Sequence, residues 1–267
     1  METGKSRYSQ LIGAIFNKYY EDGKDEIGFK RADIVTQAEA LNIKLPKNLG
    51  DVLYSFRYRV PLPESITSKA PEGYEWVIRP AGRAQYKLSL VKKSRIMPSE
   101  IMAETKIPDA TPGVIIKYSS NDEQALLAKI RYNRLIDIFT RITCYSLQNH
   151  FRTTVSGMGQ VETDEIYIGI DNRGVHYVLP VQAKSRTVQI GVVQIEQDIA
   201  VCEEKFPNLI NRPIAAQLMD ENIIALFELE KDEENNIRVS SEKHYKLVHP
   251  DDLSSEVLER YKIRTIT

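Results

Sequence analysis

The chain has 267 residues, of which 42% are hydrophobic and 27% are charged, a composition typical of a soluble protein with a packed core. No run approaches the roughly 20 apolar residues of a membrane-spanning helix, and the first ten residues lack the apolar segment of a secretory signal. Cys144 and Cys202 have no metal-ligand spacing and are too few for a disulfide framework. We therefore expect a cytoplasmic protein without a membrane partner.

The formal net charge of −1 conceals an uneven distribution along the chain. Residues 1–95 carry 17 Lys and Arg against 11 Asp and Glu, whereas residues 96–267 carry 19 against 26. A basic segment followed by an acidic segment is typical of a DNA-binding domain joined to a second domain that is rich in carboxylates. Unevenly charged solvated surfaces are the alternative, and charge alone does not decide between them.

Residues 1–95 follow the order of a winged helix-turn-helix domain. Apolar residues at helical spacing predict helices over 6–20, 29–43 and 45–59, and residues 73–91 form a predicted hairpin about "RPAGRA". In a winged helix-turn-helix the third helix enters the major groove and the hairpin touches the DNA backbone. The alternative is a small structural or protein-binding domain with a solvated basic face.

Basic and aromatic side chains lie on or beside the third predicted helix and on the hairpin. Arg and Lys bind phosphate, and Arg is the commonest reader of guanine edges. The residues expected to bind DNA are Lys47, Tyr54, Arg57, Arg59, Arg79, Arg83 and Lys87.

Residues 96–120 contain three prolines and no sustained period, which predicts a linker, and residues 121–267 then form a second domain. A helical pattern covers 120–149, with Ser120 or Asn121 as its cap. Three strands follow within 150–185, the last two joined at "DNRG", and then a helix within 186–207 and two strands about "MDEN". The acidic "EKDEENN" is most simply a solvated turn. This order predicts an α/β fold with a mixed sheet flanked by helices.

Three polar residues of the "DNRG" hairpin point to a single site. The start of the first strand lies beside the end of the second, so Asp164 is expected near Gln182 and Lys184. Alternation places Gln182 and Lys184 on one face and Ala183 on the packed face. Because polar groups are costly to bury, we expect the strand "VLPVQAKSR" to surface at its end, as an edge or bent strand that tolerates Pro180.

Magnesium chemistry fits these residue types. Mg²⁺ prefers oxygen ligands, usually one or two carboxylates with water and phosphate, and it activates water for attack on a phosphodiester. A nearby ammonium orients the water and stabilises negative charge. The alternative to a metal site is an amphipathic hairpin whose acids and lysine lie on a solvent-exposed edge and have no catalytic role.

The stretch "TDEIYIGIDNRGVHYVLPVQAKS", between a long helix and a second helix followed by strands, resembles the PD-(D/E)xK nuclease core. Restriction endonucleases, Mrr-like enzymes and Holliday-junction resolvases share this core, and the resemblance covers residues 120–230. The Mrr-like branch commonly has glutamine at the position of Gln182. The resemblance implies a restriction-endonuclease-like core with a mixed central sheet flanked by helices.

The resemblance also implies a role for each matching residue. Asp164 would be the principal metal ligand, Gln182 and the backbone carbonyl of Ala183 would offer neutral oxygens, and Lys184 would position the attacking water. Because Gln182 lacks a charge, a second carboxylate should compensate. Glu123, which matches a glutamate on the helix before the sheet, and Glu162 are the candidates, with Glu165 third. Gln194 and Gln197 could also face the site, although solvated glutamines fit equally well.

The function implied is that of a type II restriction endonuclease, which hydrolyses double-stranded DNA at a specific sequence with Mg²⁺, or with Mn²⁺ in its place. One site per chain suggests a homodimer on a two-fold symmetric sequence. No other small-molecule cofactor is expected. The alternatives are a modification-dependent Mrr-like endonuclease and a non-catalytic winged-helix regulator that binds DNA without cutting it.

Overall fold

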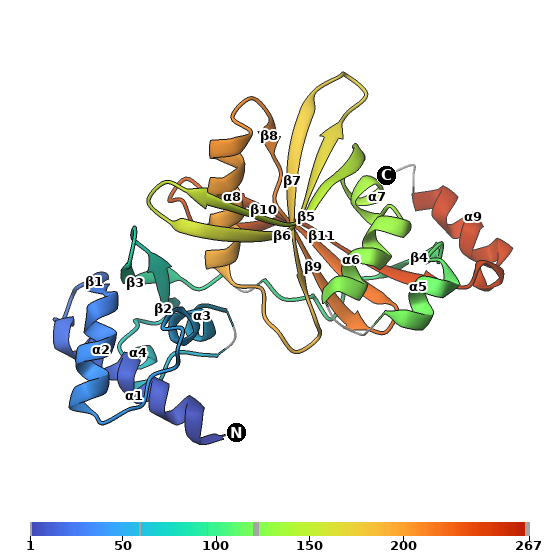
Figure 1. The fold of residues 1–267 in the computed structure, drawn as a ribbon. Coiled ribbons are helices and arrows are strands. Elements are labelled where there is room, and N and C mark those ends of the chain that lie inside the picture. Colours follow the sequence, from blue (N-terminus) through green and yellow to red (C-terminus); the bar gives the residue numbers. More distant parts are fainter. Residues whose placement is uncertain (1, 59, 95, 120–122, 265–267) are drawn as a thin grey trace.

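Two β-sheets organise the chain in the computed structural model, which describes residues 2–58, 60–94, 96–119 and 123–264. A small antiparallel sheet has the strand order β1-β3-β2, and a large mixed sheet has the order β4-β11-β10-β9-β7-β6-β5, with β8 paired to β7. The N-terminal helices and the small sheet lie to one side of the large, curled sheet, and α8 lies between the two parts (Figure 1).

The N-terminal part contains the predicted helices and hairpin together with one unpredicted strand, β1, and one short unpredicted helix, α4. Its elements are α1 (Glu2–Tyr19), β1 (Glu26–Lys30), α2 (Arg31–Ala40), α3 (Gly50–Tyr58), α4 (Glu64–Thr67), β2 (Tyr74–Pro80) and β3 (Gln85–Lys92). The helix predicted from residue 29 begins at Arg31, where the backbone N–H of Lys30 donates to Asp33 Oδ2 at 2.8 Å. Residues 29 and 30 instead belong to β1, which buries Ile27 and Phe29.

The segment predicted as a linker contributes to the large sheet. It forms β4 (Glu104–Pro108), which pairs in parallel with β11 at the sheet edge, and α5 (Gly113–Tyr118). Asn133 holds the stretch between them, because its side-chain Oδ1 accepts from the backbone N–H of Ala110 at 2.7 Å and its Nδ2 donates to Thr111 Oγ1 at 2.9 Å.

The helix predicted over 120–149 is wrong in its second half. It divides into α6 (Glu123–Tyr132) and α7 (Leu135–Thr140), and the chain then enters β5 (Thr143–Val155). Arg134 and Arg141 have φ angles of 50° and 59°, and a right-handed helix cannot continue through the left-handed region. The predicted caps, Ser120 and Asn121, lie outside the described residues.

The remaining elements follow the predicted order and then extend it. They are β6 (Gly159–Ile170), β7 (His176–Lys184), α8 (Val192–Lys205), β8 (Ile210–Asn211), β9 (Ile214–Asp220), β10 (Ile223–Lys231), β11 (Ile237–Val248), a 3-10 turn (Pro250–Asp252) and α9 (Ser255–Arg264). The hairpin β6–β7 is antiparallel, and α8 crosses over to β9, which pairs with β7 in parallel. Strands β8 and β11 and helix α9 were not predicted. None of the described helices is long and apolar enough to cross a membrane.

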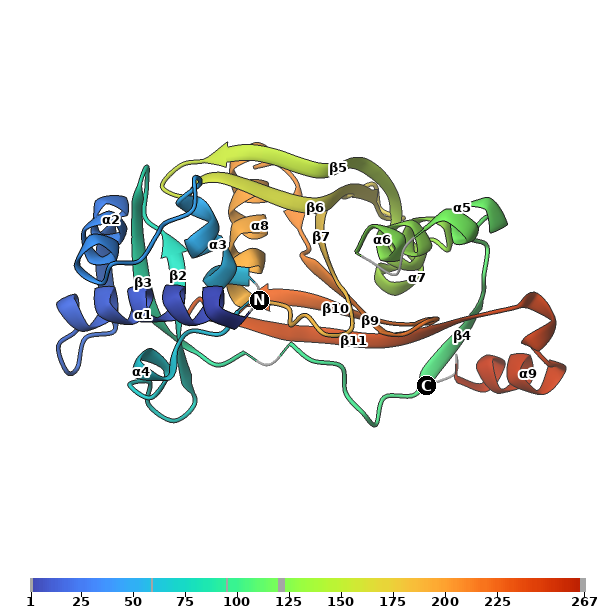
Figure 2. The same cartoon turned by 60° about the horizontal axis from the view of Figure 1, so that its bottom comes forward.

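Helices cover both faces of the large sheet around β7. Val181 and Ala183 pack with residues of α6 and α7, whereas Val178 packs with Val201 and Cys202 of α8. In Figure 2, α6 and α7 lie toward the end of the sheet that carries α5 and α9, and α8 lies toward the N-terminal part.

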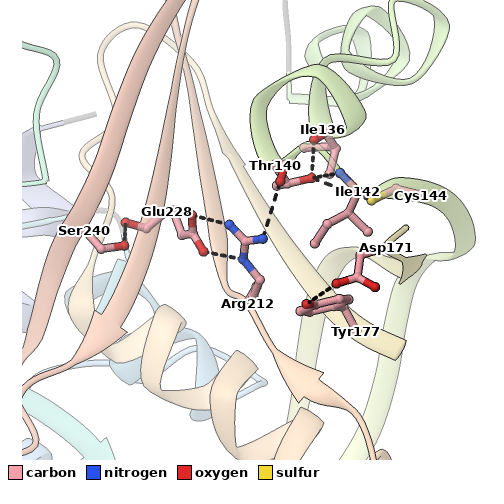
Figure 3. Close-up of polar contacts among 9 residues, drawn as sticks. All are labelled: Ile136, Thr140, Ile142, Cys144, Asp171, Tyr177, Arg212, Glu228 and Ser240. Carbon is pink, nitrogen blue, oxygen red and sulfur yellow. Dashed lines mark hydrogen bonds and ion pairs between the residues drawn. The ribbon is translucent and has the colours of Figure 1, made fainter. Parts of the chain in front are cut away.

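A polar cluster secures the start of β7. The "DNRG" turn is held by Asp171, whose Oδ1 accepts from the backbone N–H of Val175 at 3.0 Å and whose Oδ2 accepts from the Tyr177 hydroxyl at 3.0 Å. Arg212 forms a two-point ion pair with Glu228 on β10 and reaches the carbonyl of Thr140 on α7, as Figure 3 shows. These contacts attach α7 to the sheet and leave the other end of β7 for the predicted site.

Strand β7 is central, so the expectation that it surfaces at its end is wrong. Gln182 and Lys184 are 1% and 5% exposed, and β6 and β9 flank the strand. Pro180 is tolerated because β7 changes its parallel neighbour there: Val178 pairs with Asn211 of β8, and Val181 pairs with Ile214 of β9. Pro180 thus lies between the part of β7 that pairs with β8 and the part that pairs with β9, so its missing N–H removes no hydrogen bond from either parallel pairing.

The N-terminal hairpin is docked on α8. Arg79 of β2 forms a two-point ion pair with Glu196, in which Nε donates to Oε2 at 2.8 Å. In addition, Val91 and Ile96 share one hydrophobic cluster with Phe227 of β10 and with buried residues of α8. The small sheet and the large sheet are thus joined by a common core.

Candidate functional site

Asp164, Lys184 and Glu123 come together from three different elements at the end of β7. Asp164 Oδ2 accepts a hydrogen bond from the backbone N–H of Ala183 at 2.9 Å, and Lys184 Nζ lies 3.5 Å from Glu123 Oε1 at the start of α6. The side chain of Lys184 is 6% exposed, whereas that of Glu123 is 40% exposed. An almost buried ammonium therefore lies beside one half-buried carboxylate, that of Asp164, and one more accessible carboxylate, that of Glu123.

Strand β6 does not alternate regularly near Asp164, and this affects which way the carboxylates of Glu162, Asp164 and Glu165 point. Thr163 contacts Asp198 on α8, and Ile166 also packs against α8, although residues three apart face opposite sides of a regular strand. His150, which lies opposite Asp164 between two paired positions, has a φ angle of 48°. Glu162 was expected to share a face with Asp164 if the strand were regular, and β6 is not regular at this point.

Glu162 and Glu165 have partners outside the site. Glu162 contacts His150 Nδ1 at 2.9 Å and accepts from Arg152 Nε at 2.8 Å. Glu165 is fully buried and accepts from Arg131 Nε at 3.0 Å. Of the three acids considered as the second carboxylate, Glu123 is the one in contact with Lys184.

Burial makes the charge on Asp164 costly. Desolvation raises the pKa of Asp164 above its ordinary value, although Lys184 and the N–H of Ala183 both favour the carboxylate, and the nearby charge of Glu123 raises the pKa further. A cation placed between these two acids would lower that cost.

Gln182 faces a residue that the sequence did not single out. Its Nε2 donates to Asp198 Oδ1 on α8 at 3.2 Å, and Thr163 Oγ1 donates to the same oxygen at 2.6 Å. Asp198 is 1% exposed, and desolvation raises its pKa to about 8. The sequence did contain one indication of this residue. Asp198 comes three residues after Ile195 and one before Ile199, so a helical pattern places this acid on the apolar face of α8.

The oxygen donors at the end of β7 suit a hard cation. Within the described ranges, no set of three or more His, Cys, Asp and Glu residues lies close enough to hold a metal ion. Mg²⁺ is usually held by one or two carboxylates and completes its coordination with water and phosphate. The carboxylates of Asp164 and Glu123, the amide oxygen of Gln182 and the carbonyl of Ala183 therefore fit magnesium in kind.

Comparisons of the chain with protein-family models, curated proteins and solved structures found no match.

The residues expected to bind DNA have different surroundings. Lys47 and Arg83 are exposed, and Tyr54 on α3 is 47% exposed. Lys87 pairs with Glu26 at 2.7 Å within the small sheet. Arg79 is bound to Glu196 and joins the hairpin to α8, so a DNA contact would require this pair to break.

Two further residues of that set are on or just after α3. Arg57 is half-buried near the end of the helix, and Arg59 lies outside the described residues.

Asp198→Asn is expected to make the stability of the protein less dependent on pH. An unfolded aspartate titrates near pH 3.9, and the folded pKa is about 8, so the folded state holds one more proton between these values. The free energy of unfolding should therefore fall as pH rises through this window, by at most about 1.4 kcal/mol per pH unit. Urea denaturation from pH 5 to 8 in EDTA should show a steeper decline for the wild type than for Asp198→Asn. Equal slopes would contradict the prediction.

Proposed function

We propose that the protein is a magnesium-dependent endonuclease that hydrolyses double-stranded DNA at a specific sequence, in the manner of a type II restriction enzyme. The observation that carries the proposal is the nearly buried ammonium of Lys184, 3.5 Å from Glu123 and at the end of the hairpin that holds Asp164. An ammonium is costly to bury, and phosphodiester hydrolysis uses such a group beside carboxylates.

The order of the elements around the site supports a PD-(D/E)xK core. Helix α6 precedes the β6–β7 hairpin, and α8 and β9 follow it, with helices on both faces of the sheet. The N-terminal helices and three-stranded sheet support a winged-helix domain whose exposed Lys47, Tyr54 and Arg83 contact DNA.

Each residue of the site has a distinct task in the proposed reaction. Asp164, Glu123, the Gln182 amide oxygen and the Ala183 carbonyl would hold Mg²⁺, which supplies an activated water and offsets charge on the phosphate when bound. Lys184 orients the attacking water by hydrogen bonding and stabilises the negative charge that grows on the phosphate oxygens. The backbone N–H of Ala183 fixes the Asp164 carboxylate in its orientation.

The test is incubation of supercoiled plasmid with the purified full-length protein in Mg²⁺, in Mn²⁺ and in EDTA. We expect metal-dependent linear products with defined ends, and end mapping then gives the cut position. Cleavage of methylated plasmid alone would favour the modification-dependent alternative. A shift of DNA in a gel without cleavage in either metal would contradict nuclease activity and favour the regulator.

Cleavage of both strands with one site per chain further calls for a homodimer on a two-fold symmetric sequence. Light scattering of the protein on a duplex that carries the mapped sequence should give two chains per duplex, and a single chain would contradict this part of the proposal.

A further inference from the structure

The hairpin of β5 and β6 extends beyond the body of the large sheet. Strand β6 pairs with β7 from Glu165 onward, whereas residues 159–164 of β6 pair with β5 alone. Residues 149–164 therefore form a two-stranded ribbon, which runs toward the side of the N-terminal part in Figure 1 and Figure 2. Its loop is held by α8, because the backbone N–H of Ser156 donates to Glu204 Oε2 at 2.8 Å.

The two faces of the ribbon have different surroundings. On the inner face, Val155 and Val161 are buried in a cluster with residues of α8. The outer face carries two cross-strand pairs of exposed side chains, Thr154 with Gln160 and Arg152 with Glu162. The next position of β6 along this row is Asp164. The inner face is thus fixed to α8, and the outer face is open to a partner and leads to the candidate metal site.

Strand β5 and its loop are poor in negative charge. Residues 143–160 contain no Asp or Glu, although residues 96–267 together carry 26 acids against 19 Lys and Arg. The side chains of His150 and Arg152 are 52% and 66% exposed. An exposed strand without acids, next to a site proposed for a phosphodiester, suits contact with a polyanion.

We propose that the outer face of this ribbon reads base edges in the major groove beside the cut position, and that Arg152 is its principal specificity-determining residue, a reader of guanine. This inference rests on the proposed function, because it requires double-stranded DNA at the site of Asp164. It places base recognition on the large sheet and leaves phosphate contacts to the exposed basic residues of the N-terminal part.

The contacts of Arg152 favour a base edge over a phosphate. Its Nε donates to Glu162 Oε2 at 2.8 Å, and the described residues give neither Nη group another hydrogen bond. Two Nη groups held in one plane match O6 and N7 of guanine. The carboxylate of Glu162 repels a phosphate group and does not repel an uncharged base. Glu162 therefore orients Arg152 and directs it toward the groove.

The dimensions of the ribbon agree with this role. The major groove is about 12 Å wide and admits a two-stranded ribbon. Arg152 is two residues from His150, the residue opposite Asp164, which corresponds to about 7 Å along the strand. Because base pairs follow one another at about 3.4 Å along the duplex, the guanine should lie roughly two base pairs from the cut.

The test measures sequence preference without cleavage. The full-length wild type selects duplexes from a random pool, once in EDTA and once in Ca²⁺, and gels confirm that the DNA stays intact. Fluorescence anisotropy then gives the affinity for the selected duplex and for a scrambled one. Arg152→Gln should lower the affinity for the selected duplex by about 10- to 100-fold and abolish the preference at one guanine. Its affinity for the scrambled duplex should stay within about threefold of the wild type.

Two further variants separate base reading from a general effect of charge. Arg152→Lys keeps the charge and loses the planar fork, so it should lose the preference as Arg152→Gln does, whereas a phosphate contact would be restored by lysine. Arg173→Gln is the matched control, because Arg173 is an exposed arginine bonded to Asp171 at 3.1 Å in the turn at the other end of β6. It should change neither affinity.

The inference is overturned by wild-type preference in Arg152→Gln, by full recovery in Arg152→Lys, or by an equal loss in Arg173→Gln. A wild type without sequence preference in either condition overturns it as well. Selective binding through Arg152 by a protein that never cuts DNA would contradict the proposed function alone. Specific cleavage that Arg152→Gln leaves unchanged would contradict this inference alone.

Discussion

Lys184→Met is expected to lower the rate of Mg²⁺-dependent plasmid cleavage by about 10²- to 10³-fold, the usual cost of removing one preorganised donor from a developing anion. Methionine keeps an unbranched apolar chain of similar length in a site where Lys184 is 5% exposed, and it removes the charge alone. The measurement is the initial rate of plasmid linearisation at saturating Mg²⁺, with the melting temperature recorded for each variant.

The control is Lys129→Met, which removes a lysine from the last turn of α6. Lys129 Nζ donates to the carbonyl of Glu221 at 2.6 Å, outside the candidate site. Its loss should leave the cleavage rate within about twofold of the wild type, since surface contacts of this kind contribute little. A folded Lys184→Met protein that cuts at the wild-type rate would exclude the proposed site.

Phe227→Ala is expected to reduce the free energy of unfolding by about 3–5 kcal/mol, the usual cost of deleting a buried aromatic ring. Phe227 is fully buried in the cluster that joins β10, α8 and the N-terminal Val91 and Ile96. Because the cavity is enclosed by three separate segments, little of it can be closed by local movement. Urea denaturation followed by circular dichroism gives the change in midpoint.

Ile138→Ala serves as the comparison, because Ile138 is 44% exposed on α7. It should cost about 0.5 kcal/mol or less, as surface substitutions do. A loss below about 1 kcal/mol for Phe227→Ala would mean that the shared cluster does not stabilise the fold as described.

The features that were predicted correctly from the sequence are those determined by residues close together in the chain. The "DNRG" turn and the alternation on either side define the β6–β7 hairpin, and the hairpin alone brings Asp164 to the main chain of Ala183. Glu123 was nominated from the resemblance to a family, and its contact with Lys184 is a tertiary one that no local pattern predicts.

The incorrect expectations concern interactions between distant parts of the chain. Strand β7 was expected to surface because its own residues gave no sign that β9 would pair with its far side. The break at Arg134 comes directly after Asn133, whose side chain bonds to residues 110 and 111 as well as to the helix, and these distant contacts leave no local pattern in the sequence. Asp198 was missed because its partners, Thr163 and Gln182, belong to two other elements.

The parallel pairing of β4 with β11 restricts the order in which the protein can fold. Glu104 lies opposite His244, so the two strands are separated by about 140 residues of chain. During synthesis β4 emerges from the ribosome long before its partner, and its hydrogen-bonding groups stay unmatched until β11 follows. Such long-range pairing slows folding and exposes strand edges to association with other chains. We therefore expect the edge formed by β4 to be the last part of the large sheet to assemble.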